Sequence, residues 1–197
     1  MRSTILLLLL LLPIGLSGQA TPSSTDYTEA DMNMLNPNRM LLRTKSAGAY
    51  GTKGSPYVFE EFKKGNMYYS NKQRVSNIVL NYDCHNNQLV YTTGESVYLL
   101  NSSQIDFFEA FTGGDTVMLF EQVFVENIKK RIFMRVLYNE NSILYKRYYK
   151  DFKEADYGGA YSQDRRYDEY HDRHAYYLKS GDKKLQVLKP RKKAILE

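Results

Sequence analysis

The sequence contains one cysteine, no tryptophan and no long apolar segment after its first residues. Because Cys84 stands alone, the chain has no internal disulfide framework. We interpret Cys84 as a small buried side chain, with an intermolecular disulfide or a reactive thiol as the alternatives. The longest apolar run, residues 5–12, is shorter than the roughly 20 residues that a membrane-spanning helix needs. The sequence therefore predicts no transmembrane segment.

Motifs of the common hydrolases are also missing. Neither Gly-x-Ser-x-Gly nor His-Glu-x-x-His occurs, and no spacing of carboxylates singles out a general acid and base. Cys84 precedes His85, but sequence neighbours in a tight turn do not form a nucleophile–base pair. No nucleic-acid-binding motif is present either. These absences favour a non-enzymatic protein with no cofactor and no nucleic-acid partner, and they leave the question of an enzyme open.

The first twenty residues have the features of a secretory signal peptide. Arg2 provides a positive start, residues 5–12 form the apolar region, and Gly18 and Ala20 place small residues at the −3 and −1 positions of a cleavage site. We predict cleavage after Ala20. The protein is then expected to be secreted or periplasmic.

The remaining residues are enough for one domain with a sizeable core. A polar stretch at 21–52 predicts a flexible N-terminal arm, and residues 53–197 predict a single β domain. Tyrosine and phenylalanine, 18 and 9 residues, are frequent in short alternating runs that are separated by turn residues. We predict an all-β fold, an antiparallel meander of about ten strands that forms a curved sheet or an open barrel.

The alternating runs give the positions of most expected strands. Ile105, Phe107 and Phe111 are expected to share one face of their strand. Residues 150–173 are polar and break the rhythm, which predicts a long loop. Pro190 predicts the first residue of a short C-terminal helix. The expected strands cover residues 75–82, 89–92, 97–100, 105–111, 116–125, 132–138, 143–149, 174–179 and 183–188.

Charge is distributed unevenly between the two halves of the chain. Residues 21–123 have a net charge of −3, whereas residues 124–197 have a net charge of +7. The basic half ends in Lys183, Lys184 and the cluster at 189–193. Such a cluster predicts contact with an acidic surface, such as anionic lipid or a polyanionic glycan, with a solvated chain end as the alternative.

The predicted loop at 150–173 contains the candidate binding residues. Tyrosine rings offer flat apolar faces, and arginine guanidinium groups bind carboxylate or phosphate through two parallel hydrogen bonds. Both residue types are frequent at protein interfaces. A polar loop held by tyrosine packing is the structural alternative. The candidate binding residues are Tyr157, Tyr161, Arg165, Arg166, Tyr167 and Tyr170.

His171 and His174 have the spacing of metal ligands, and Asp168, Glu169 and Asp172 lie beside them. On a helix, residues three apart share a face, but in a strand they point to opposite faces. Because the surrounding sequence indicates a loop that leads into a strand, we predict no metal site and keep the two histidines as weak candidates.

Several motifs resemble those of an uncharacterised family of exported, β-rich bacterial envelope proteins. The resemblance covers about residues 50–197, and it implies a β-rich secreted or envelope protein without implying an activity. The matching segments are residues 53–57, 64–66, 80–83, 89–90, 144–148, 154–157, 176–178 and 189–193.

Together these features predict an exported, non-enzymatic module that binds an envelope protein or a glycan surface. The alternative is a hydrolase that acts on envelope polymers, with its site near residues 150–174. The two hypotheses require different arrangements of side chains in the structure. A deep pocket that gathers Asp164, Asp168, Glu169 and the two histidines would favour the enzyme, whereas a surface of tyrosine and arginine would favour binding.

Overall fold

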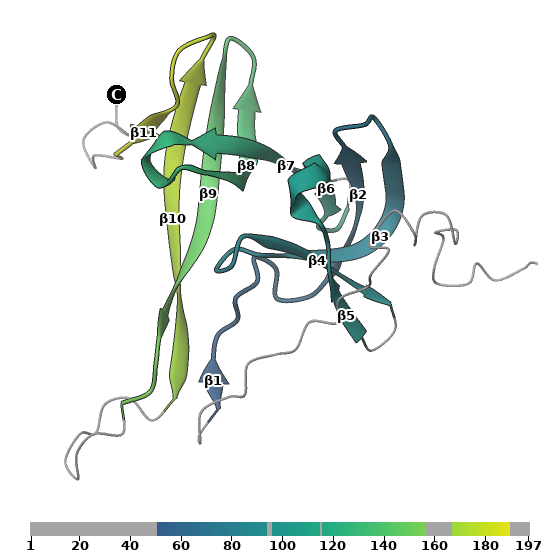
Figure 1. The fold of residues 1–197 in the computed structure, drawn as a ribbon, viewed down its shortest axis with the longest axis vertical. Coiled ribbons are helices and arrows are strands. Elements are labelled where there is room, and N and C mark those ends of the chain that lie inside the picture. The colour runs from purple at the N-terminus through teal and green to yellow at the C-terminus, as the bar shows by residue number, and fades with distance from the viewer. Residues whose placement is uncertain (1–50, 94–95, 115, 157–166, 190–197) are drawn as a thin grey trace, which may run out of the picture.

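The computed structural model describes residues 51–93, 96–114, 116–156 and 167–189. Eleven strands form one open sheet, and these residues contain no α-helix, only the short 3-10 helices η1 (Ser102–Gln104) and η2 (Glu126–Ile128) (Figure 1). The predicted all-β class is confirmed. The predicted signal peptide, almost all of the predicted arm at 21–52 and the predicted C-terminal helix from Pro190 lie outside the described residues.

The strands follow a single order across the sheet, β1-β10-β9-β8-β7-β6-β2-β3-β4-β5, and β11 pairs with β10. Neighbouring strands are antiparallel except β1 and β10, which are parallel. In chain order the strands are β1 (Thr52–Lys53), β2 (Lys63–Tyr69), β3 (Arg74–Asp83), β4 (Gln88–Thr93), β5 (Ser96–Leu99), β6 (Ile105–Phe111), β7 (Val117–Val125), β8 (Lys130–Asn139), β9 (Ser142–Lys153), β10 (Asp168–Ser180) and β11 (Gln186–Leu188).

The chain departs from the predicted simple meander at β6. Strands β2 to β5 form one series of hairpins and β6 to β10 form another, but β6 pairs with β2 instead of with β5. At this junction, a Cβ atom on Gly65 would lie 2.0 Å from the backbone oxygen of Glu109. Glycine is therefore required where the two series of hairpins meet.

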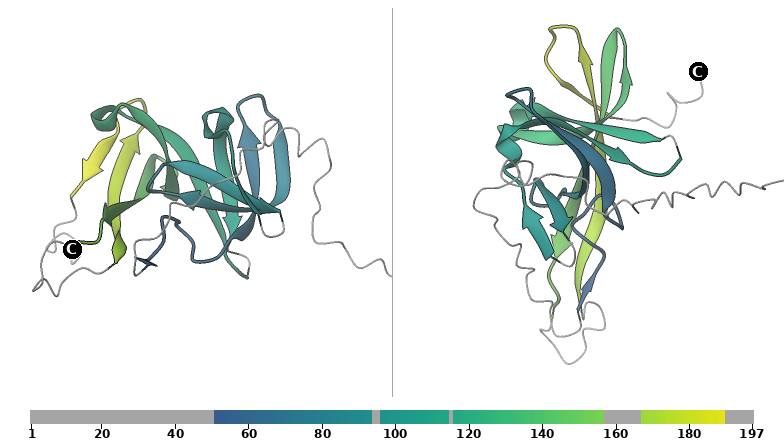
Figure 2. Two further views of the ribbon diagram at one scale, coloured as in Figure 1. Left: turned by 60° about the horizontal axis from the view of Figure 1, so that its bottom comes forward. Right: turned by 90° about the vertical axis from the view of Figure 1, so that its right-hand side faces the viewer.

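Alternate side chains of the central strands enter two cores on opposite faces of the sheet. In β8, Phe133 joins a core with Phe108, whereas its neighbour Met134 joins a second core with Tyr145. Successive residues of a strand point to opposite faces, so the two cores lie on either side of the sheet. The sheet is strongly curved, as the views in Figure 2 show.

A register shift in the pairing of β2 with β6, between Tyr68 and Tyr69, changes which side chains of β6 are buried. Ile105 and Phe108 are fully buried, whereas Phe107 is only half-buried. The expectation that Ile105 shares a face with Phe107 is therefore wrong, whereas Phe107 and Phe111 do lie on one face. An irregularity of this kind shifts the alternation by one residue, which periodicity alone does not reveal.

The predicted loop at 150–173 is shorter than expected, because both of its ends are strands. Strand β9 continues to Lys153 and β10 begins at Asp168, and their register pairs Lys150 with Asp172 and Phe152 with Tyr170. Opposite charges across the hairpin make a polar sequence compatible with strand pairing. The β9–β10 hairpin is therefore longer than the strands at 143–149 and 174–179 that the apolar pattern predicts.

Residues 54–62, which we call the strap, connect β1 to β2 and lie along β3. The Val58 amide donates to the Tyr82 carbonyl at 2.9 Å, and the Cys84 amide donates to the Pro56 carbonyl at 3.0 Å. Because β1 pairs with β10, the strap joins two parts of the sheet that are far apart in strand order. Figure 1 shows this connection between the long β9–β10 hairpin and the β2–β5 side.

Candidate functional site

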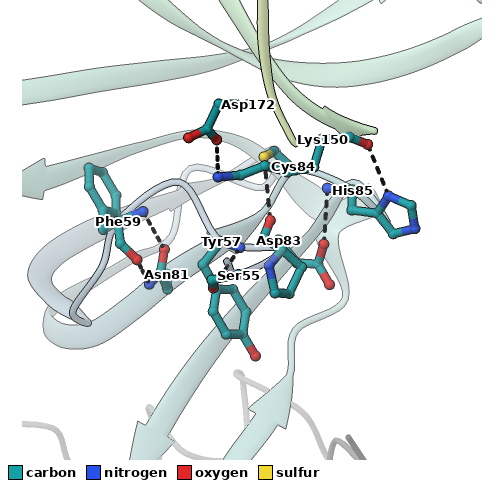
Figure 3. Close-up of polar contacts among 10 residues, drawn as sticks. Ser55, Tyr57, Phe59, Asn81, Asp83, Cys84, His85, Lys150 and Asp172 are labelled. Atoms are coloured by element: carbon teal, nitrogen blue, oxygen red, sulfur yellow. Dashed lines mark hydrogen bonds and ion pairs between the residues drawn. The ribbon is translucent and has the colours of Figure 1, made fainter. Parts of the chain in front are cut away.

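Asn81 anchors the strap to β3 through its side-chain amide (Figure 3). Its Nδ2 donates to the Phe59 carbonyl at 2.9 Å, and its Oδ1 accepts from the Phe59 amide at 3.2 Å. Asn81 is fully buried, and Oδ1 also accepts from the Tyr82 amide at 2.9 Å. A buried amide that satisfies backbone groups in this way fixes the path of the strap.

The other end of the strap passes very close to β10. Gly54 has a φ of +73°, and a Cβ atom there would lie 2.9 Å from the Tyr170 carbonyl oxygen. A residue with a side chain would meet both a strained backbone and a steric contact. Gly54 therefore allows the strap to leave β10 and to cross toward β3.

A cleft with a volume of about 430 Å³ opens between the strap and the β9–β10 hairpin. We call it the strap cleft. Its volume falls in the range of about 300–1,000 Å³ that is usual for small-molecule sites. Both aromatic and charged side chains line it. The lining residues that matter here are Tyr57 and Glu60 of the strap, Lys146 and Tyr148 of β9, and Tyr170, Asp172 and His174 of β10.

The hydroxyl group of Tyr57 remains protonated over a wide pH range. Burial, followed by the charge of Asp83 and the neighbouring Tyr170, raises the pKa of Tyr57 above its usual value. A neutral phenol can donate as well as accept a hydrogen bond. Tyr57 therefore brings a flat ring and a hydroxyl group to the cleft.

Cys84 also lines the cleft but is not suited to act as a nucleophile. Its Sγ donates to the Pro56 carbonyl at 3.4 Å, and Lys150 close by forms an ion pair with Asp172 (Figure 3). Burial is the main cause that raises the pKa of the Cys84 thiol to about 12, although Lys150 lowers it. The reactive form of cysteine is the thiolate, so this thiol is inert at neutral pH. The structure supports the small buried side chain expected from the sequence.

His85, in the turn after β3, contacts the β9–β10 hairpin around Lys150 and Tyr170. Its Nδ1 lies 3.1 Å from the Lys150 carbonyl oxygen. Its ring packs against Tyr170 and Phe152, with centroid distances of 5.4 and 5.9 Å. His85 thus positions the hairpin next to the strap cleft and does not face Cys84 as a general base.

The structure places two of the six candidate binding residues. Tyr170 lines the strap cleft. Tyr167 lies outside the cleft lining, with its ring centroid 3.7 Å from Lys53 Nζ. The other four candidates, Tyr157, Tyr161, Arg165 and Arg166, lie outside the described residues.

The two histidines both lie in β10, three residues apart, and therefore point to opposite faces of the strand. His171 Nε2 lies 3.1 Å from a Glu169 carboxylate oxygen, whereas His174 lines the strap cleft. Asp168 accepts a hydrogen bond from the Ala155 amide at 2.9 Å. Within the described ranges, no three His, Cys, Asp or Glu side chains gather as a metal-binding group.

Sequence reasoning missed the strap and the lining residues of β9, among them Lys146 and Tyr148. The run Gly54-Ser55-Pro56 indicates a turn, but it does not indicate what the turn crosses. Lys146 and Tyr148 alternate with Tyr145 and Arg147, so one face of β9 could have been separated from the other. That pattern alone does not reveal which partner covers each face.

A second, polar cleft of about 440 Å³ lies near η1 and includes Asn87, Gln122 and Arg131. Its amide groups already serve internal contacts. Gln122 Nε2 donates to the Ser102 carbonyl at 3.0 Å, and Asn87 Nδ2 donates to the Arg131 carbonyl at 2.9 Å. The strap cleft is therefore the better candidate site.

Comparison with known proteins finds no family model, no curated protein and no solved structure that matches the chain. The resemblance to exported envelope proteins thus stays a prediction. In the part of the chain that the structure describes, no helix is long and apolar enough to cross a membrane.

Proposed function

We propose that the protein is an exported, non-enzymatic module that binds a glycan surface through the strap cleft. The observation that supports this most is the lining of the cleft, which combines the rings of Tyr57, Tyr148 and Tyr170 with charged side chains. Sugars present apolar C–H faces and hydroxyl groups side by side. A cleft that combines flat rings with hydrogen-bonding groups suits such a ligand.

Export is the second part of the proposal. The signal-peptide pattern in residues 1–20 supports a secreted or periplasmic location. The basic C-terminal end at residues 183–193 then adds a cationic region that would favour contact with an acidic envelope surface.

The arrangement of acidic residues supports binding rather than hydrolysis. Asp168 and Glu169 are engaged by the Ala155 amide and by His171, and neither lines the strap cleft. Two carboxyl groups do line it: Asp172 is paired with Lys150, and Glu60 is exposed on the strap. A glycosidase needs two carboxyl groups that flank the bond to be cleaved.

A protein partner is the second candidate, and the exposed apolar side chains favour it. Phe124 and Tyr138 are 53% and 50% exposed. Aromatic residues on a surface are frequent in protein interfaces. Their positions on β7 and β8 differ from those of the strap-cleft residues, so the two candidates can be tested separately.

The test is sedimentation of the exported protein with cell envelopes of the organism that makes it, before and after protease treatment of the envelopes. The Glu60→Ala/His174→Ala variant removes two exposed charged or polar groups of the cleft. The Glu61→Ala/Lys179→Ala variant is the control, since both of its residues are exposed and lie outside the cleft lining.

The proposal predicts that the protein sediments with protease-treated envelopes, that the cleft variant sediments several-fold less, and that the control behaves like the wild type. Loss of sedimentation after protease treatment would assign the binding to a protein partner. Equal sedimentation of the two variants would place the glycan site outside the strap cleft.

A further inference from the structure

Two cations lie side by side next to the strap cleft, where Lys146 belongs to the lining and its strand neighbour Arg135 lies beyond it. Arg135 in β8 lies directly opposite Lys146 in β9 in the antiparallel register, so both side chains lie on the same face of the sheet. Both residues are half-buried. Like charges directly opposite each other destabilise a sheet, because they repel.

This pair lacks a counter-charge, unlike other cations of the same hairpin. Lys150 is paired with Asp172, and Arg173 Nε lies 2.9 Å from an Asp151 carboxylate oxygen. Among the described residues, no carboxylate lies within 4.0 Å of the charged groups of Arg135 or Lys146. The part of the chain that the structure describes therefore provides no ion pair for this positive charge beside the cleft.

Tyr148 holds the two cations in place. Arg135 Nη1 donates to the Tyr148 hydroxyl oxygen at 3.5 Å, and Lys146 Nζ lies 4.7 Å from the centroid of the Tyr148 ring. The ring in turn packs against Phe120, with 6.1 Å between the centroids. Because its oxygen accepts from Arg135, the Tyr148 hydroxyl hydrogen can be donated to a bound group.

Arg135 also has unused hydrogen-bonding capacity. Its Nε is buried and has no hydrogen-bond partner among the described residues. Such a donor is costly unless it gains an acceptor of its own. The charge, the positioning by Tyr148 and the unused Nε donor all point to an anionic partner.

We infer that Arg135, Lys146 and Tyr148 form a subsite for an oxyanion of the bound glycan, so that the ligand is an acidic saccharide. This inference rests on the proposed function. A carboxylate, sulfate or phosphate group between the two cations replaces their repulsion by two attractive contacts. Charge-assisted hydrogen bonds of this kind are about twice as strong as neutral ones, and the planar guanidinium matches the oxyanion geometry.

The test uses a double variant with a matched control. Arg135→Gln/Lys146→Gln removes the charges of the subsite, and Lys130→Gln/Lys179→Gln removes the same charge from exposed positions outside the cleft lining and outside the basic C-terminal end. Each protein is tested for sedimentation with protease-treated envelopes. Each is also tested for retardation in gels that contain polygalacturonate, its neutral methyl ester, dextran sulfate or neutral dextran.

The inference predicts that the subsite variant binds the envelopes and at least one acidic polymer about tenfold less tightly than the wild type, while the control stays within about twofold. The preferred acidic polymer shows whether the oxyanion is a carboxylate or a sulfate. If the subsite variant binds envelopes like the wild type, the inference is wrong and the proposed function remains. If the wild type binds neither envelopes nor polymers, the proposed function fails as well.

A second measurement distinguishes a role of Lys146 in anion binding from a role in the stability of the fold. The inference predicts that Lys146→Gln has an equal or higher melting temperature than the wild type, because the change removes a like-charge contact. It also predicts that added sulfate raises the melting temperature of the wild type more than that of the variant. A lower melting temperature of the variant, or an equal effect of sulfate, would make Lys146 a structural residue and overturn the inference.

Discussion

Four buried phenol and thiol groups make the core sensitive to high pH. Burial is the main cause that raises the pKa of Cys84 from 9.0 to about 12 and that of Tyr69 from 10.0 to about 12. Burial also raises the pKa of Tyr82 and Tyr145, and for Tyr145 the hydrogen bond to Glu121 adds to the effect. In each case the folded protein keeps a proton that the unfolded chain releases at lower pH.

The free energy of unfolding is therefore expected to fall as the pH rises. The stabilisation by these protons is fully present below the unfolded pKa and is lost toward the folded pKa, which places the loss between about pH 9 and 12. Each group contributes a slope of about 1.4 kcal/mol per pH unit within its own interval. Urea denaturation at a series of pH values measures this slope.

The Cys84→Ala variant is the matched control for this prediction. Without the thiol, the decrease should begin only above about pH 10, where tyrosines of the unfolded chain start to ionise. A wild-type stability that stays constant up to about pH 11 would show that these groups are open to solvent.

At the scale of elements, the strap depends on the close passage of Gly54 over Tyr170. We predict that Gly54→Ala destabilises the protein more than Gly51→Ala. Both positions have positive φ, +73° and +91°, so both changes carry a backbone penalty of about 1 kcal/mol. Only at Gly54 would the new Cβ atom also meet a backbone oxygen, because nothing lies within 4 Å of it at Gly51.

Chemical denaturation and amide hydrogen exchange measure this difference. Gly54→Ala should in addition speed the exchange of the Val58 amide, which joins the strap to β3 by donating to the Tyr82 carbonyl. Equal destabilisation by both variants, with no change in exchange at Val58, would mean that the strap does not depend on this approach.

The sequence predicts the hairpin strands well and the other elements poorly. Strands β3, β4, β7 and β8 lie close to their expected positions, because alternation and turn residues are local signals. The pattern does not mark β2, although this strand connects the two series of hairpins. The same pattern predicts a loop at the ends of β9 and β10, because their charged residues pair across the hairpin and do not alternate with apolar ones.

At the scale of the whole molecule, the pairing of β6 with β2 and the path of the strap determine where the cleft lies. Neither follows from local pattern, since both bring together segments that are far apart in sequence. The candidate site could be predicted only for Tyr170 and the region around it. Lys146 and Arg135 have no special spacing, and the register of β8 with β9 is what places them opposite each other.

The central claim, that the strap cleft is the binding site, is tested most directly by amide hydrogen exchange in the presence of soluble glycan fragments released from protease-treated envelopes. The account predicts slower exchange in the strap at 54–60 and in the hairpin at 146–150 and 170–174, with no change around Ser102 and Gln122 in the polar cleft. Slower exchange confined to the polar cleft, or no change in the strap and hairpin while the fragments bind, would contradict it.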